Sequence, residues 1–155
     1  MFDDLRDLYQ EVILDHGRKP RNFRRLETPD LNARGDTPMC GDRMELFLKL
    51  SPGEGRIADA AFQGRGCAIS MASASLMTET VKGKTVEEAR GMAARFREMA
   101  MTGTCPDCGG ALEEEMDRLQ ALSGVHEYPS RVKCATLAWH TLNTALDGGK
   151  EASSE

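Results

Sequence analysis

The stretch CGDRMELFLKLSPGEGRIADAAFQGRGC, residues 40–67, contains two strand-like runs and begins and ends with a cysteine. Apolar and polar residues alternate from 44 to 50, the period of a β-strand with one buried face. The segment SPGEG at 51–55 is rich in turn-forming residues, and a second strand is expected over 56–64. The stretch therefore predicts a β-hairpin that places a cysteine at each of its two outer ends.

On either side of this hairpin the sequence predicts one more extended piece and several helices. Residues 31–37 are expected to add a third strand, and residues 2–16 form an amphipathic helix. Helical patterns follow at 70–83, 85–100, 113–124 and 130–146, and Thr85 and Glu88 have the spacing of a capping box. Trp139, Met71, Leu76 and Met77 are expected in the core. An antiparallel sheet followed by helices predicts an α+β fold, with a three-stranded sheet packed against four to five helices.

Length and charge limit the classes of function. The 155 residues predict one domain over 1–147, and the polar residues 148–155 are expected to form a disordered tail. A net charge of −5 disfavours a nucleic-acid-binding surface. No apolar run approaches the roughly 18 residues that span a bilayer, and acidic residues stand at the N-terminus in place of a signal peptide. A soluble, cytoplasmic protein without membrane contact is expected.

Three of the five cysteines flank predicted elements. Cys40 precedes the first strand of the hairpin, Cys67 follows the second, and Cys134 lies in the first turns of the last helix. Together with Asp42 they can supply three sulfurs and one oxygen, a set that suits tetrahedral Zn²⁺. On the residues alone a second interpretation stays open, in which the cysteines are small buried side chains and Asp42 is a turn residue.

Three motifs occur in an order that resembles a known family. MCGDRMEL at 39–46, FQGRGCAISMASASLMTETVKGK at 62–84 and YPSRVKCATLAWHTL at 128–142 closely resemble the SufU branch of the IscU/NifU-N iron–sulfur assembly family. LYQEVILDHGRKPRN at 8–22 fits the opening helix of that family. The resemblance implies a SufE/NifU-like α+β fold in which Cys40, Asp42, Cys67 and Cys134 meet in one site.

The resemblance also implies a function and its partners. IscU-type members assemble a [2Fe–2S] cluster and carry a histidine before the last cysteine, whereas this chain has Lys133 there. SufU-type members bind zinc and carry an insertion, which residues 95–124 would form here. They accept persulfide sulfur from a SufS-type, pyridoxal-phosphate-dependent cysteine desulfurase. Downstream iron–sulfur assembly proteins are the other expected partners. Cys40 is then the expected sulfur carrier, and Arg131 a candidate contact for the desulfurase.

Cys105 and Cys108 depart from the SufU pattern, because they form a CxxC pair inside the insertion. An accessory loop feature without catalysis is the first interpretation of this pair, and an auxiliary metal pair is the second. For the whole chain three functions stay open: a zinc-dependent sulfurtransferase, a scaffold for a [2Fe–2S] cluster, and a zinc-stabilised interaction module without chemistry of its own.

Overall fold

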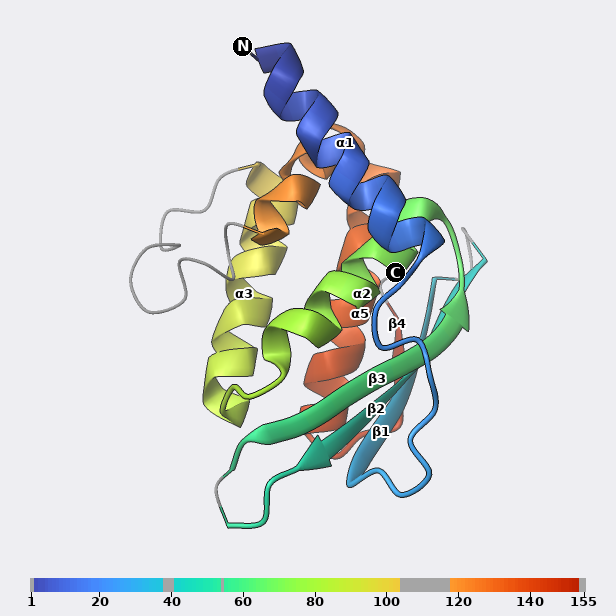
Figure 1. The fold of residues 1–155 in the computed structure, drawn as a ribbon, viewed down its shortest axis with the longest axis vertical. Helices are drawn as coiled ribbons and strands as arrows, with labels where there is room; N and C mark the ends of the chain where they lie inside the picture. Colours follow the sequence, from blue (N-terminus) through green and yellow to red (C-terminus); the bar gives the residue numbers. More distant parts are fainter. Residues whose placement is uncertain (1, 38–40, 54, 104–117, 154–155) are drawn as a thin grey trace.

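A computed structural model describes residues 2–37, 41–53, 55–103 and 118–153 of the chain. The elements in chain order are α1 (Phe2–Arg18), β1 (Leu31–Thr37), β2 (Asp42–Leu50), β3 (Ile57–Arg65), α2 (Ala68–Val81), α3 (Val86–Thr102), the 3₁₀ helix η2 (Gln120–Glu127), α5 (Pro129–Leu146) and β4 (Glu151–Ser153). The sheet forms one layer and the helices form a second layer that packs against it (Figure 1). The α+β class predicted from the sequence is therefore confirmed.

The sheet has four strands in the order β3-β2-β1-β4, which corrects the expected three. β1, β2 and β3 pair antiparallel, whereas β4 runs parallel to β1 and aligns Glu151 with Arg34. The amide of Arg34 also donates to the carbonyl of Lys150 at 2.7 Å. β4 falls inside the tail that was expected to be disordered. Its polar side chains gave no strand signal, because an edge strand is held by backbone hydrogen bonds that need no apolar residue.

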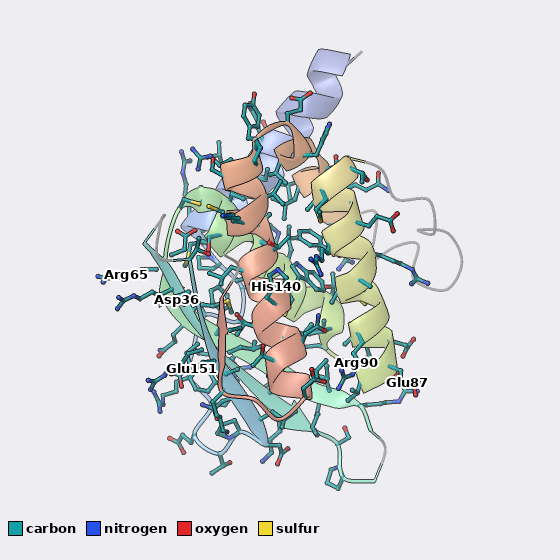
Figure 2. The ribbon with its side chains drawn as sticks, turned by 180° about the vertical axis from the view of Figure 1, so that it is seen from behind. Asp36, Arg65, Glu87, Arg90, His140 and Glu151 are labelled. Carbon is teal, nitrogen blue, oxygen red and sulfur yellow. The ribbon has the colours of Figure 1, made fainter. Side chains whose placement is uncertain are left out.

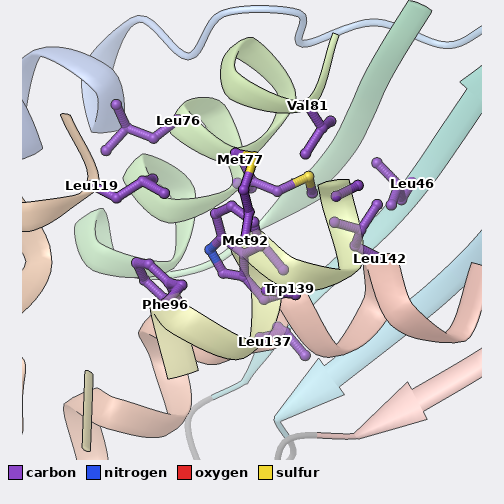
Figure 3. Close-up of a cluster of buried hydrophobic side chains, with 14 of the residues drawn as sticks. Leu46, Leu76, Met77, Val81, Met92, Phe96, Leu119, Leu137, Trp139 and Leu142 are labelled. Carbon is purple, nitrogen blue, oxygen red and sulfur yellow. The ribbon is translucent and has the colours of Figure 1, made fainter. Parts of the chain in front are cut away.

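The core lies between the helices and the inner face of the sheet (Figure 3). Trp139 of α5 stacks on Phe96 of α3 with ring centroids 4.9 Å apart. Trp139, Leu76 and Met77 are at most 2% exposed, as the sequence predicted, whereas Met71 is only partly buried against the core. In the hairpin, Leu46 is fully buried while its chain neighbour Glu45 points to the other face of the sheet. No helix among the described residues is both long and apolar enough to cross a membrane.

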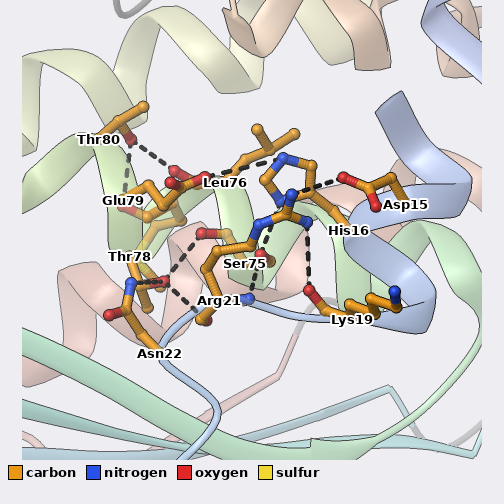
Figure 4. A network of polar contacts seen from close by, with 11 residues as sticks. Asp15, His16, Lys19, Arg21, Asn22, Ser75, Leu76, Thr78, Glu79 and Thr80 are labelled. Atoms are coloured by element: carbon orange, nitrogen blue, oxygen red, sulfur yellow. Dashed lines mark hydrogen bonds and ion pairs between the residues drawn. The ribbon is translucent and has the colours of Figure 1, made fainter. Parts of the chain in front are cut away.

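A polar network joins the end of α1 to α2 (Figure 4). The Nδ1 atom of His16 lies 2.7 Å from the Ser75 hydroxyl, which accepts a hydrogen bond from the Arg21 amide at 2.8 Å. The hydroxyl is then free to donate to Nδ1, and Nε2 faces Glu79 at 3.7 Å. Burial, and secondly the charge of Arg21, lower the pKa of His16. A neutral imidazole at the end of α1 is therefore favoured.

The predicted start of α3 is confirmed in detail. Thr85 caps the helix by accepting from the Glu88 amide at 3.1 Å, and the Glu88 carboxylate accepts from the Thr85 amide at 3.0 Å. Of the helix predicted over 113–124, residues 118–119 are α-helical and residues 120–124 belong to the 3₁₀ helix η2, which extends to Glu127.

Candidate metal centre

The hairpin register brings the start of β2 to the end of β3. Arg43, the second residue of β2, pairs with Arg65, the last residue of β3. Asp42 therefore lies beside the turn at Gly66 and Cys67, which leads from the sheet into α2. The start of β2 and the end of β3 therefore lie side by side, as the predicted hairpin requires. Cys40 lies outside the described residues.

Asp42, Cys67 and Cys134 converge at this end of the sheet. One donor atom from each of them lies within 4.8 Å of the other two. Asp42 is 1% exposed and Cys134 is 2% exposed, whereas Cys67 is half-buried. The three ligands expected from the sequence within the described residues thus come together from β2, the start of α2 and α5.

Local hydrogen bonds fix the orientation of Asp42 and Cys67. The amide of Cys67 donates to Oδ1 of Asp42 at 3.0 Å, and Sγ of Cys67 lies 3.9 Å from Oδ2. Cys67 is also the N-cap of α2, where its sulfur accepts from the Ser70 amide at 3.4 Å. Both side chains are therefore held in place by backbone groups at a helix N-terminus, where negative charge is stabilised.

Gly66 lets the Asp42 carboxylate approach the backbone. A Cβ at position 66 would lie 2.6 Å from Oδ1 of Asp42 and 3.2 Å from the Ser70 hydroxyl. Only glycine leaves this space open. Neither this contact nor the position of Ser70 was predictable from the sequence, because both depend on how the turn packs against β2.

Cys134 reaches the site because α5 begins at Pro129 and packs on α2. Proline suits the first turn of a helix, where its missing N–H costs nothing. The hydroxyl of Ser73 donates to the carbonyl of Ala135, which joins α2 to α5 one residue beyond Cys134. The thiol is thus buried between two helices that are fixed to each other.

The spacing of the donors fits a tetrahedral metal ion. Ligand atoms on zinc, with Zn–S near 2.3 Å and Zn–O near 2.1 Å, lie about 3.6–3.8 Å apart. The observed 3.9 Å from Cys67 Sγ to Asp42 Oδ2 is close to this value. All donor atoms lie within 4.8 Å of one another, so the distance between any two of them must shorten by about 1 Å at most to bind the ion. Thiolate and carboxylate donors suit zinc, and thiolates also bind iron–sulfur clusters.

The remaining predicted site residues lie at the edge of the centre or outside the described part. Arg131 is exposed in the first turn of α5, and Lys133 is half-buried directly before Cys134. Cys105 and Cys108 fall within 104–117, outside the described residues. The ring of His126 lies next to Gly103, and its Nδ1 atom lies 2.9 Å from the carbonyl oxygen of Ser123.

Comparison with known proteins assigns the chain to a family. The family model for the NifU-like N terminal domain matches residues 8–135. The chain is 41% identical to the zinc-dependent sulfurtransferase SufU of Bacillus subtilis over 92% of each chain. It is 39% identical to the iron–sulfur cluster assembly scaffold protein IscU of Streptococcus pyogenes, over 92% of this chain and 84% of that protein.

The fold agrees with this assignment. A crystal structure from Fervidobacterium islandicum, described as an iron–sulfur cluster assembly scaffold protein for the SUF system, superimposes with a TM-score of 0.78 at 34% identity, over 88% of this chain and 94% of that one. The chain belongs to the NifU-like N-terminal domain family of iron–sulfur cluster assembly proteins.

Proposed function

We propose that this protein is a zinc-bound sulfur acceptor for a SufS-type cysteine desulfurase. Cys40 receives the persulfide sulfur, and Asp42, Cys67 and Cys134 hold the metal. The observation that carries the proposal is the convergence of these last three donors within 4.8 Å at one end of the sheet. The name of the B. subtilis relative, a zinc-dependent sulfurtransferase, supports zinc as the metal.

Burial supports the division of roles among the cysteines. A thiol that accepts sulfur from another protein must be reached by the donor persulfide. Cys134 is only 2% exposed, and the half-buried Cys67 uses its sulfur as the cap of α2. These two thiols are suited to retaining a metal, which agrees with the resemblance to the SufU branch, in which the thiol at the position of Cys40 exchanges with the donor.

The transfer step needs no external oxidant. The Cys40 thiolate attacks the terminal sulfur of the persulfide on the desulfurase, and a new S–S bond forms on Cys40. The S–S bond on the desulfurase breaks, and its cysteine leaves as a thiolate. A bound zinc ion would keep the thiols deprotonated without oxidising them, because zinc has no accessible redox change. Asp42 and the two other cysteines hold their places during this exchange.

A second candidate is a scaffold that assembles a [2Fe–2S] cluster on the same residues. The names of the IscU relatives favour it, since they are described as cluster assembly scaffolds. Lys133, which precedes Cys134 in this chain, distinguishes the candidates, because the resemblance implies a histidine, a potential metal ligand, at this position in scaffold-type members. A lysine cannot serve as that ligand while it is protonated.

Metal and sulfide analysis separates the two candidates. Protein purified without oxygen and without added metal is expected to contain about one zinc per chain and no labile sulfide. Iron with equivalent sulfide and a visible chromophore would instead identify a scaffold. About two zinc ions per chain would assign a second metal site to the Cys105 and Cys108 pair.

The sulfur-transfer step is tested with Cys40→Ser. This variant is expected to abolish stimulation of a SufS-type desulfurase in an assay that follows alanine release from cysteine. A double variant, Cys105→Ser with Cys108→Ser, serves as the matched control and should keep the stimulation. Full stimulation by Cys40→Ser would refute the assigned role of Cys40.

A further inference from the structure

Two buried serines of α2 bond to different elements that pack around this helix. Ser73 and Ser75 are both fully buried. Ser75 bonds to His16 at the end of α1, whereas the hydroxyl of Ser73 donates to the carbonyl oxygen of Ala135 in α5 at 2.5 Å. Figure 2 shows α5, which carries the labelled His140, in front of α2. The serine-rich stretch of α2 therefore bonds to its neighbours as well as packing against them.

The bond from Ser73 differs from those of other buried hydroxyls in the same two helices. Thr80 of α2 donates to the Leu76 carbonyl at 2.9 Å, and Thr141 of α5 donates to the Leu137 carbonyl at 2.8 Å. Each of these bonds returns to the helix that carries the hydroxyl, a common arrangement for threonine within a helix. Such a bond does not constrain a second helix, whereas the Ser73 bond joins an α2 side chain to the α5 backbone.

The three donors of the metal centre are divided between these two helices. Cys67 is the N-cap of α2, and its amide binds the Asp42 carboxylate at 3.0 Å, so both donors keep their place relative to α2. Cys134 instead belongs to α5 and stands one residue before Ala135, the acceptor of the Ser73 bond. The distance from Cys134 to the other two donors therefore depends on how α5 is placed on α2.

Apolar packing alone constrains this placement less sharply than a metal ion requires. The hydrophobic effect is roughly proportional to buried area and has no direction, whereas a hydrogen bond needs a defined distance and angle. Metal–ligand distances tolerate deviations of only about 0.2 Å. One residue of an α-helix rises about 1.5 Å, so a shift of α5 by a third of a residue would move Cys134 by about 0.5 Å. A directional bond beside Cys134 opposes such a shift.

We propose that Ser73 is a positioning residue of the metal centre, which holds Cys134 at the distance from Cys67 and Asp42 that the metal requires. The inference rests on the proposed function, because it needs a metal at these three donors. Ser73 is not itself a ligand, since its hydroxyl is bonded to the Ala135 carbonyl and acts through the α5 backbone. Its effect falls on metal affinity and coordination geometry more than on the stability of the fold.

The test compares Ser73→Ala with the matched control Thr141→Val. Each change removes one fully buried hydroxyl that donates to a backbone carbonyl, but only the Ser73 hydroxyl reaches across to another helix. Competition for zinc against a chromophoric chelator should show about ten-fold weaker binding in Ser73→Ala and wild-type binding in Thr141→Val. Protein loaded with Co²⁺ in place of zinc gives a second measurement, because the visible absorption of Co²⁺ depends on its coordination geometry. This spectrum should change in Ser73→Ala alone.

Urea unfolding of the metal-free proteins separates positioning from a general structural role. Ser73→Ala is expected to fold, because alanine favours a helix more than serine does and offsets part of the lost hydrogen bond. Both variants should therefore keep the circular dichroism spectrum of the wild-type protein. If Ser73→Ala fails to fold while Thr141→Val folds, the bond is a requirement of the whole fold and the inference is overturned.

The metal measurements decide the inference separately from the proposed function. A zinc affinity and a Co²⁺ spectrum in Ser73→Ala equal to those of Thr141→Val would overturn the positioning role while the proposed function stands. If the wild-type protein binds neither zinc nor Co²⁺ through its thiols, the proposed function and the positioning role both fall.

Discussion

Replacement of Gly66 by alanine is expected to damage the metal centre without removing a ligand. The added Cβ would lie 2.6 Å from Oδ1 of Asp42, where ordinary contact begins near 3.4 Å. The carboxylate must therefore move by about 0.8 Å, whereas metal–ligand distances tolerate only about 0.2 Å. Changes to groups that orient ligands typically reduce metal affinity about 10–100-fold. This corresponds to about 1.4–2.7 kcal/mol of binding free energy.

The assay is a competition for zinc between the metal-free protein and a chromophoric chelator. Gly124→Ala is the control, because a Cβ at position 124 meets no atom within 4 Å. The Gly66 variant should keep the circular dichroism spectrum of the wild-type protein, since Gly66 is exposed and lies between elements. An unchanged zinc affinity in Gly66→Ala would refute the assignment of Asp42 as a ligand held in this position.

Three further predictions concern stability. Burial lowers the pKa of His16 below its usual value near 6.5, so the unfolded chain takes up the proton more readily and the free energy of unfolding should fall as the pH drops below about 6.5. In His16→Gln the free energy of unfolding, measured by urea titration between pH 5 and 7.5, should depend less on pH. His140 titrates alike in both proteins and so cancels in the comparison. An equal pH dependence in the two proteins would contradict a buried, neutral His16. Gly91→Ala, in the interior of α3 and with open space around the new Cβ, should raise the free energy of unfolding by about 0.5–1 kcal/mol, and a lower melting temperature would argue against the helix boundaries. Truncation after Gly148 removes β4 and should lower the free energy of unfolding, measured in urea, by about 1–2 kcal/mol, with the zinc content unchanged. An unchanged free energy of unfolding would show that the pairing of β4 with β1 does not stabilise the protein.

The hairpin was predictable because its information is local. Alternation along 44–50 fixes which side chains face the core, and the cysteine positions then follow from the register. The capping box at Thr85 is equally local. The fourth strand was not predictable, because residues 151–153 carry no alternation and depend on an edge that only the folded β1 provides.

Tertiary contacts explain what the sequence left open at the site. The His16 network requires α1 to lie on α2, so the burial that favours the neutral ring depends on tertiary packing and could not be predicted from the sequence of α1. The role of Gly66 depends on a carboxylate 24 residues earlier in the chain. Cys134 was expected near a helix start, but its burial follows from the packing of α5 against α2.

Under the proposed function, the centre must meet two requirements that a single rigid set of ligands cannot meet. A metal ion that stays with the protein needs donors held by the fold, and Asp42 and Cys134 are buried while Cys67 is fixed as a helix cap. Sulfur transfer instead needs one thiol that can leave the metal and meet a partner. A carboxylate among the retained ligands helps, because its harder oxygen does not compete with the thiols for sulfur. If Asp42, Cys67 and Cys134 retain the metal while Cys40 exchanges, zinc should remain bound in Cys40→Ser, with weaker affinity. In Cys134→Ser, zinc should be lost.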